Sequence, residues 1–258
     1  MSVEAEKAEA KTSVKDTVRV IIHALILALL VRIFLFQPFN IPSGSMIPTL
    51  LIGDYLFVSK YSYGYSRYSF PFGLNLFSGR VWAKQPDRGD VVVFKLPHDT
   101  EVDYIKRIIG LPGDKIQMRA GRLYINDQMV DRERIEDYLV RGERPGQFAR
   151  ASRYVETLPG GKKHEIIELM GDNGPLDNTE VYTVPQGSYF AMGDNRDNSL
   201  DSRVPPDAPQ PGVGYIPKAN LVGRAEFLFF STDGSAAIWE FWKWPGALRI
   251  QRFFSGIH

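Results

Sequence analysis

Two serines near residue 45 and one lysine at residue 106 are the side chains best suited to nucleophilic catalysis. Ser43 and Ser45 lie in the segment Ile41-Pro-Ser-Gly-Ser-Met-Ile-Pro-Thr-Leu50, where two prolines restrict the backbone. A serine hydroxyl is a poor nucleophile by itself, because its own pKa is far above neutral, so it needs a base that removes its proton. Another segment of the chain has to supply that base.

Lys106 is the candidate base. It lies in the segment Asp103-Tyr-Ile-Lys-Arg-Ile-Ile-Gly-Leu-Pro-Gly-Asp114, whose β-branched beginning predicts a strand. Alternate residues of a strand share a face, so Lys106 lies beside Tyr104 and Ile108, whereas Arg107 points the other way. Desolvation among apolar neighbours lowers a lysine pKa and makes the neutral amine usable as a general base.

A third polar stretch, Gly193-Asp-Asn-Arg-Asp-Asn-Ser-Leu-Asp-Ser-Arg203, offers hydroxyl and carboxylate groups that could orient a lysine or fix a loop. Taken alone, each stretch also suits a plain structural role. The serine segment could be a turn, Lys106 could extend from its strand to solvent, and the third stretch could be a loop with local Asx turns. Only the combination of the three favours catalysis.

Other chemistries find little support in the sequence. The four histidines, at positions 23, 98, 164 and 258, show no metal-ligand spacing, and there is no cysteine. His98 with Asp99 is the only triad-like pair, and no serine stands in a G-x-S-x-G motif. Lys plus Arg (31) nearly balances Asp plus Glu (30), so no overall field favours nucleic acid. We expect no metal, no cofactor and no nucleic-acid partner.

The elements that must position these residues begin with an apolar run from Val20 to Phe36, which contains only His23 and Arg32 as polar residues. We predict a transmembrane anchor over residues 20–37. A buried core helix would keep a polar face, which this run lacks. A cleavable signal peptide would end in small residues spaced A-x-A, whereas this run ends in Leu-Phe-Gln-Pro-Phe.

The charges flanking the anchor predict its orientation. Lys7, Lys11, Lys15 and Arg19 precede the span, and the first basic residue after Arg32 is at position 60. By the positive-inside rule, residues 1–19 form a cytoplasmic tail and the chain from about residue 40 faces outward.

Beyond the anchor, short runs of β-branched and aromatic residues alternate with Gly and Pro, which predicts a mostly β protein with coiled or barrel-like antiparallel sheets. We expect little helix outside the anchor, apart from a short turn near Ser45. We assign residues 38–126 and 188–232 to a catalytic core and the more polar residues 127–187 to a smaller inserted β lobe. Residues 233–258 alternate aromatic and basic side chains, which suits either an interfacial membrane segment or a packed terminal element.

Together, the anchor and the three stretches resemble bacterial type I signal peptidase, the membrane-bound Ser-Lys endopeptidase also called leader peptidase. The resemblance covers the anchor and residues of about 39–60, 88–114 and 187–225, but not 127–187 in detail. It implies that Ser45, in Ser-Met-x-Pro-Thr-Leu, is the nucleophile and that Lys106, in Tyr-Ile-Lys-Arg, is the general base. It also implies activity without a cofactor.

The same resemblance implies supporting roles for other residues. Ser43 falls where the family places an oxyanion-hole hydroxyl, although some relatives have Gly there. Ser199 matches a serine that hydrogen-bonds the lysine amine, and Asp201 and Arg203 match a supporting ion pair. Two further residues match the family's Gly-Asp-Tyr stretch after the nucleophile: Asp54 and Tyr55.

The resemblance also implies a substrate and a location. The family cuts after small residues at the −1 and −3 positions of signal peptides on exported preproteins, at the outer face of the bacterial cytoplasmic membrane. We expect a single-pass monomer in contact with the lipid bilayer. Two alternatives stay open: a Ser-Lys peptidase dedicated to one exported substrate, and a non-enzymatic membrane-anchored scaffold for secretion partners. The residues expected to line the substrate pockets are Phe39, Ile41, Pro42, Met46, Leu50, Tyr104, Ile105 and Leu200.

Overall fold

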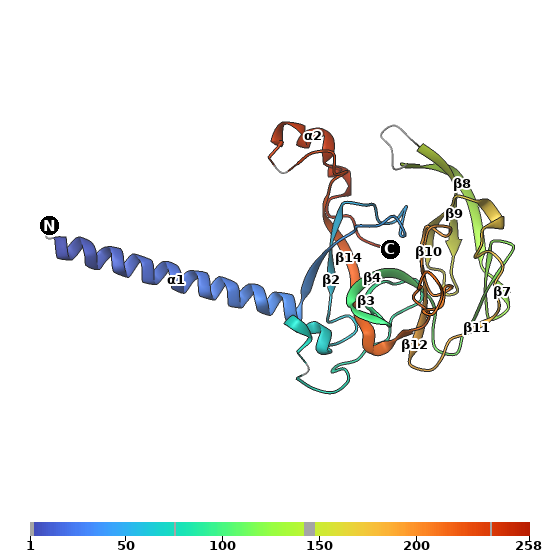
Figure 1. Cartoon of the computed structure of the whole chain (residues 1–258), viewed down its shortest axis with the longest axis horizontal. Coiled ribbons are helices and arrows are strands. Elements are labelled where there is room, and N and C mark those ends of the chain that lie inside the picture. Colours follow the sequence, from blue (N-terminus) through green and yellow to red (C-terminus); the bar gives the residue numbers. More distant parts are fainter. Residues whose placement is uncertain (1–2, 75, 142–147, 238) are drawn as a thin grey trace.

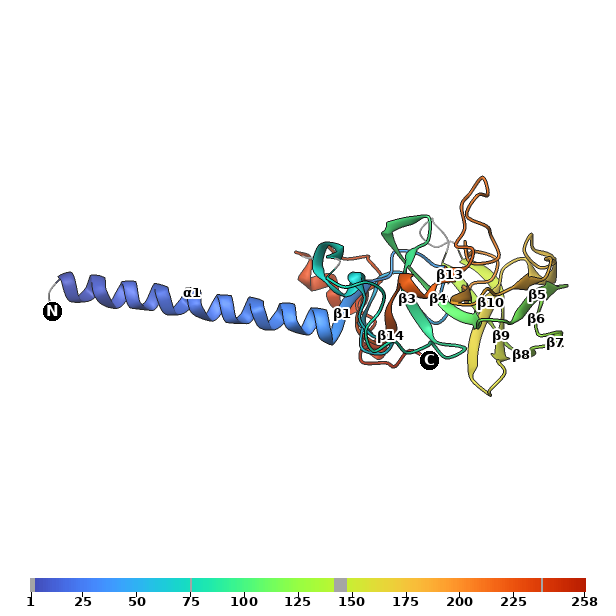
Figure 2. The same ribbon diagram turned by 90° about the horizontal axis from the view of Figure 1, so that it is seen from below.

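The computed structural model describes residues 3–74, 76–141, 148–237 and 239–258. A long helix, α1 (Val3–Phe34), projects from one end of a β body, and it does so in both Figure 1 and Figure 2. Its segment Val14–Phe34 is apolar and long enough to cross a membrane, because 21 residues rise by roughly 31 Å. Nearly all of its side chains are exposed, so no other part of the described chain covers it.

The helix differs from the predicted anchor at both ends. It extends back to Val3 through the predicted cytoplasmic tail, and it ends at Phe34 rather than residue 37. Phe36 and Gln37 instead begin strand β1 (Phe36–Asn40), which pairs with β2. Pro38 cannot continue a helix, and the pairing of β1 with β2 satisfies the backbone there. The apolar helix therefore leads into the sheet with almost no linker.

The main sheet has seven antiparallel strands in the order β1-β2-β14-β3-β4-β12-β13. Strand β3 is a valine-rich run that lies between β14 and β4, and its burial on both faces accounts for its continuous apolar sequence. The remaining strands are β2 (Asp54–Ser59), β3 (Val91–Leu96), β4 (Asp99–Gly110), β12 (Ser188–Met192), β13 (Ile216–Pro217) and β14 (Leu221–Ser231).

The main sheet is curled. Strands β1 and β4 are separated in the sheet by three other strands, yet both line one groove. Two such strands can border the same groove only if the sheet bends round between them. The predicted fold class, mostly β with barrel-like antiparallel sheets and one N-terminal apolar helix, is thereby confirmed.

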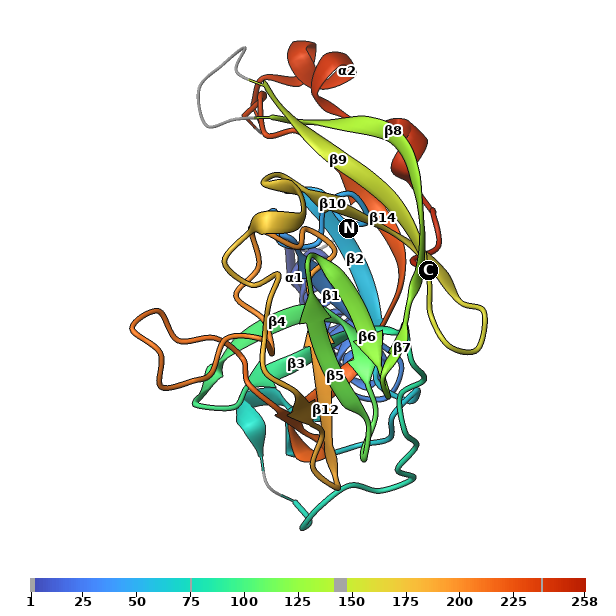
Figure 3. The same cartoon turned by 90° about the vertical axis from the view of Figure 1, so that its right-hand side faces the viewer.

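Two smaller sheets lie beside the main one (Figure 3). One has four strands: β5 (Lys115–Arg119), β6 (Arg122–Ile125), β7 (Gln128–Met129) and β11 (Tyr182–Thr183). The other has three: β8 (Asp131–Arg141), β9 (Phe148–Thr157) and β10 (Lys163–Glu168). Strands β5 and β6, which we assigned to the core, thus pair outside the main sheet. Short strands in the core and in the lobe show the same alternation of apolar and polar residues, so this pattern alone does not reveal which sheet a strand joins.

Among the residues that the structure describes, helical structure outside α1 is confined to single turns, as expected. The residues around Ser45 form turns between β1 and β2. The short helices are η1 (Arg67–Ser69), η2 (Pro71–Gly73), η3 (Gly171–Asn173), η4 (Lys218–Asn220), η5 (Phe241–Lys243), α2 (Trp244–Ala247) and η6 (Ile250–Arg252).

The C-terminal segment has features of both alternatives that the sequence left open. It folds back on β14 through an isolated bridge between Phe227 and Gly256, and the ring of Phe253 packs on Phe230. The side chains of Trp239 and Trp242, by contrast, are 73% and 62% exposed. The end of the segment is therefore packed, and its first part presents aromatic rings to the outside.

Candidate active site

Ser45 and Lys106 meet below the groove. The Lys106 Nζ donates a hydrogen bond of 2.8 Å to the Ser45 Oγ and a second of 3.0 Å to the carbonyl of Ile105. The two residues are only 8% and 3% exposed. A buried amine that contacts a serine hydroxyl at this distance is placed to take the hydroxyl proton.

Burial lowers the pKa of Lys106. It falls from 10.5 to about 8, chiefly through desolvation, and the negative charges of Asp201 and Asp194 offset part of that effect. The position in β4 explains the desolvation: the first residues of the strand are exposed or half-buried, and the buried part begins at Lys106. The Tyr104 ring also lies 5.2 Å from the Lys106 Nζ, as expected for alternate residues on one face.

The backbone of the Ser45 turn is held by the third polar stretch. The Asn195 backbone N–H donates to the Ser45 carbonyl at 3.1 Å, and its side-chain amide donates to the Gly44 carbonyl at 3.0 Å. Gly193 is needed for this approach, because a Cβ there would lie 2.5 Å from the Ser45 carbonyl oxygen and 2.3 Å from the Ser199 Oγ. The two segments therefore fit only with glycine at position 193.

Arg107 and Asp194 form a buried ion pair that the sequence analysis missed. The Arg107 Nε and its terminal nitrogen each donate to an Asp194 carboxylate oxygen at 2.8 Å, and Thr49 Oγ1 donates to the same carboxylate at 2.5 Å. A bidentate pair of this kind fixes β4, the Ser45 turn and the 193–203 loop together. The only sequence signal was an arginine next to the candidate base on a predicted strand.

Asp201 and Arg203 form the expected pair. Two Arg203 nitrogens donate to the two Asp201 oxygens at 2.9 Å, and both residues are almost completely buried. The Arg203 guanidinium holds the pKa of the Asp201 carboxyl below its usual range, although desolvation alone would raise it. Asp201 also accepts from the Gly193 backbone N–H at 3.0 Å, so the pair fixes the loop that supports Ser45.

The lobe, residues 127–187, contacts the 193–203 loop. The Ile167 N–H in β10 donates to the Asp194 carbonyl, and the Arg196 N–H donates back to the Ile167 carbonyl. The Arg196 side chain forms a buried ion pair with Glu156 of β9. The three-stranded sheet thus braces the 193–203 loop from behind, a role that the sequence did not indicate for residues 127–187.

Ser199 and Ser43 differ from one another in their contacts. The Ser199 Oγ is buried and makes no hydrogen bond within the described residues, so the bond to the Lys106 amine implied by the resemblance is not formed here. Lys106 donates to Ser45 and Ile105 instead. The exposed Ser43 has its Oγ 3.5 Å from the Ser45 Oγ, on the open side of the dyad.

The groove over Ser45 has a volume of about 560 Å³. Of the residues expected to line it, Met46 and Leu50 do not. They are 1% and 0% exposed and pack in the hydrophobic core, because the turn after Ser45 directs them beneath the surface. The expected residues that do line the groove are Phe39, Ile41, Pro42, Tyr104, Ile105 and Leu200. Further lining residues that the sequence analysis missed are Asn40, Gly44, Val93, Val102, Asp103 and Asn198.

Asp54 connects the Ser45 turn to the C-terminal segment. Its buried carboxylate accepts from the Leu51 N–H at 2.8 Å, from Ser231 Oγ at 2.6 Å and from the Arg252 guanidinium at 2.6 and 3.1 Å. Arg252 also donates to the Thr49 carbonyl at 2.9 Å. Arg252, a basic residue of the C-terminal segment, therefore makes its contacts within the protein.

Comparison with known proteins matches the chain to one family. A family model described as signal peptidase, peptidase S26, matches residues 14–230. The signal peptidase I of Rickettsia prowazekii (strain Madrid E) is 42% identical over 248 residues, covering 90% of this chain and 89% of that protein. The signal peptidase I of Rickettsia massiliae (strain Mtu5) is 37% identical over 274 residues, covering 100% and 98%.

Among solved structures, a signal peptidase I from Enterococcus faecalis V583 matches with a TM-score of 0.31 and 26% identity, covering 55% of this chain and 97% of that chain. The assignment rests on the sequence matches, which run along nearly the whole length of this chain and of its relatives. The chain therefore belongs to the signal peptidase family, peptidase S26, and is a serine endopeptidase.

Proposed function

We propose that this signal-peptide-removing peptidase uses Ser45 as its nucleophile and Lys106 as its general base, and that it cuts after small residues at the −1 and −3 positions. The observation that carries the proposal is the 2.8 Å hydrogen bond from a buried amine to a buried serine hydroxyl. A lysine with a pKa of about 8 is partly neutral near pH 7, which is the form that a base requires.

The reaction follows from this geometry. Neutral Lys106 takes the Ser45 proton as the Ser45 Oγ attacks the scissile carbonyl carbon, and the resulting ammonium then protonates the leaving amine. In the second half, neutral Lys106 takes a proton from water, which attacks the carbonyl carbon of the acyl-enzyme. As the ester bond to Ser45 breaks, the Lys106 ammonium returns the proton to the Ser45 Oγ and the signal peptide is released. The groove above Ser45 is open to the outside, so water can reach the ester.

Ser43 is proposed to stabilise the oxyanion together with the Ser45 backbone N–H. Its hydroxyl lies on the open side of Ser45, 3.5 Å from the nucleophilic oxygen, where a substrate carbonyl would enter. Three residues of the 193–203 loop are proposed as positioning residues. The ion pair between Asp201 and Arg203 fixes the backbone at Gly193, and the Ser199 side chain lies close to Gly193.

The groove supports recognition of an extended peptide with small side chains. Strand β12 pairs with β4 only along residues 107–110, so the half of β4 that lines the groove has a neighbour on one side, β3. A substrate strand could add to this open edge through backbone hydrogen bonds. Large apolar walls, formed in part by Phe39, Ile41 and Leu200, would restrict the pockets to alanine-sized residues.

We further propose that α1 is a single membrane anchor with a cytoplasmic N-terminus, which places the β body at the outer face of the cytoplasmic membrane. The apolar length of Val14–Phe34 and the basic residues before Val20 support this topology. The exposed rings of Trp239, Phe241 and Trp242 are proposed to contact the lipid headgroup region. Quenching of tryptophan fluorescence by brominated lipid in nanodiscs tests this contact. If the double variant Trp239→Ala with Trp242→Ala shows the same quenching as the wild type, these two rings do not contact lipid.

Cleavage of preproteins tests the central proposal. The detergent-solubilised wild type should release the signal peptide after the second Ala of an Ala-x-Ala site, and Ser45→Ala and Lys106→Ala variants that still fold should be inactive. Variants that cut like the wild type would refute the dyad. A panel of unrelated preproteins separates a general signal peptidase from one dedicated to a single substrate, and complete absence of cleavage would favour a scaffold.

A further inference from the structure

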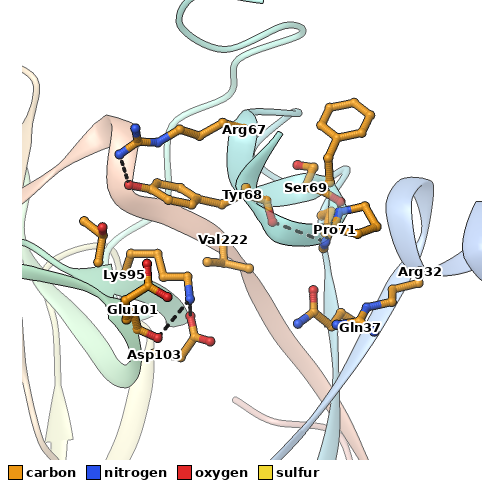
Figure 4. Close-up of a pocket in the computed structure, with 14 residues that line it drawn as sticks. Arg32, Gln37, Arg67, Tyr68, Ser69, Pro71, Lys95, Glu101, Asp103 and Val222 are labelled. Atoms are coloured by element: carbon orange, nitrogen blue, oxygen red, sulfur yellow. Dashed lines mark hydrogen bonds and ion pairs between the residues drawn. The ribbon is translucent and has the colours of Figure 1, made fainter. Parts of the chain in front are cut away.

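A second cavity, of about 490 Å³, lies beside the end of α1 (Figure 4). It is formed by the last turn of α1, by β1, by η1 and η2, and by the near ends of β3 and β4. Asp103 borders both this cavity and the groove over Ser45, but the residues of the dyad do not line it. None of the roles proposed above uses it.

The cavity carries an excess of positive charge. Its cationic side chains are Arg32, Lys60, Arg67 and Lys95, against the acidic Glu101 and Asp103. Lys95 is neutralised by Asp103 at 3.1 Å, and the Arg67 guanidinium stacks 4.6 Å from the centre of the Tyr68 ring. In Figure 4 the Lys95–Asp103 pair lies on one side of the cavity, and Arg32, Gln37 and Ser69 lie on the other.

Lys60 is the unusual member of this group. It is only 2% exposed, and its amine donates to the backbone carbonyls of Ser69 at 2.8 Å and Tyr68 at 3.4 Å. Neither Lys60 nor Arg32 has an ion-pair partner within the part of the chain that the structure describes. Burial, and then the charge of Arg32, lowers the pKa of Lys60 to about 8. Asp103 offsets only part of this effect. A buried cation without a direct ion-pair partner is costly, and an anion bound in the cavity would reduce that cost.

The place of the cavity in the fold indicates which anion is available. Arg32 lies in the last turn of α1, within the span Val14–Phe34, and this end of the span meets the β body. Just after η2, Leu74 and Leu76 are 52% and 65% exposed. A cationic cavity next to exposed apolar side chains at the end of a spanning helix matches a molecule that has an anionic head and acyl chains.

We propose that this cavity binds the phosphate of an anionic phospholipid of the outer leaflet, with Arg32 and Lys60 as its main contacts. The proposal rests on the proposed membrane anchoring, but not on the Ser-Lys mechanism. An acidic peptide segment would satisfy the same charges, yet it would not account for the exposed leucines. A zwitterionic lipid would bring a cation toward Arg32 and is therefore expected to bind more weakly.

Native mass spectrometry of the full-length protein tests the site. The protein, stripped of lipid in a neutral detergent, is incubated with equal amounts of phosphatidylglycerol and phosphatidylcholine with identical acyl chains. Wild type should retain phosphatidylglycerol in preference. Arg32→Gln and Lys60→Met should each weaken this retention by about tenfold, the equivalent of one modest charge contact. Lys84→Gln is the matched control, because Lys84 is an exposed cation that does not line the cavity.

Three results would overturn the proposal. Unchanged retention in Arg32→Gln would exclude the cavity as the site, and this variant stays decisive if melting curves show that buried Lys60→Met does not fold. Displacement of the lipid by inorganic phosphate at equal concentration would identify a site for free phosphate. Unchanged lipid retention in Arg32→Gln together with a raised KM for substrates that are acidic before the cleavage site would identify a peptide subsite. Because binding is measured without cleavage, failure of the proposed dyad would not affect the result.

Discussion

Lys106 and Arg107 are neighbours on β4, yet within the described residues only Arg107 has a carboxylate partner. Arg107 is held by two hydrogen bonds of 2.8 Å to Asp194, whereas Lys106 donates to the Ser45 hydroxyl and the Ile105 carbonyl. Asp194 neutralises the guanidinium directly and raises the pKa of Lys106 only from a distance. This division leaves the amine free to lose its proton while the strand beneath it stays fixed.

The pH dependence of cleavage should reflect this arrangement. Because the base must be neutral, kcat/KM is expected to rise with pH through about 8 and then level off. A Lys106→Arg variant keeps its proton and should lose activity by a factor of about 10² to 10⁴. Rates on an Ala-x-Ala peptide across neutral and alkaline pH provide the measurement. A kcat/KM that shows no limb in this range would contradict the assignment of Lys106.

Lys106→Met should be inactive but more stable than wild type at neutral pH. The pKa of Lys106 is lowered from 10.5 to about 8, so the unfolded chain binds more protons than the folded chain between these values. The cost of the buried ammonium is fully present below pH 8 and disappears as the pH rises from 8 to 10.5. It is on the order of 3 kcal/mol. Melting temperatures should therefore differ at pH 7 and converge at alkaline pH; a variant that melts below wild type at pH 7 would refute this balance.

Ser43→Ala should lower kcat by about 10²- to 10³-fold and leave KM nearly unchanged, because an oxyanion donor acts mainly in the transition state. Ser43→Thr keeps a hydroxyl at the same position and serves as the control. Steady-state kinetics on one preprotein separate the two constants. An unchanged kcat in Ser43→Ala would mean that the hydroxyl 3.5 Å from the Ser45 Oγ is not the donor.

Arg252→Gln should destabilise the protein by about 2 to 4 kcal/mol, because it leaves the buried Asp54 carboxylate without its main counter-charge. Activity should fall as well, since Arg252 also holds the Thr49 carbonyl in the turns that follow Ser45. Arg249→Gln is the matched control: Arg249 lies 3.9 Å from the same carboxylate and should matter less. Thermal melting of both variants compares them directly, and equal losses would argue against a specific role for Arg252.

The contact between Ser45 and Lys106, which we propose as the catalytic pair, joins two residues whose signals in the sequence are local. Ser45 lies in a short motif, and the alternation along one strand places Lys106 beside Tyr104 among apolar neighbours. The apolar run of the anchor and the short β-branched runs are likewise readable over a few residues. These signals were sufficient to predict the fold class, but they did not predict that the chain leaves the main sheet after β4.

What the tertiary structure alone decided depends on contacts between distant parts of the chain. Arg252 reaches Asp54 across 198 residues and Arg107 reaches Asp194 across 87, and no local pattern encodes such pairs. The family resemblance implied that Met46 lines a substrate pocket, but the turn after Ser45 directs its side chain into the core. The cavity that joins Arg32 to Lys60 likewise depends on distant segments, because residues of η1, η2, β3 and β4 line it together with the end of α1. Local sequence therefore determined which groups could react, and the folding of the sheets decided what surrounds them.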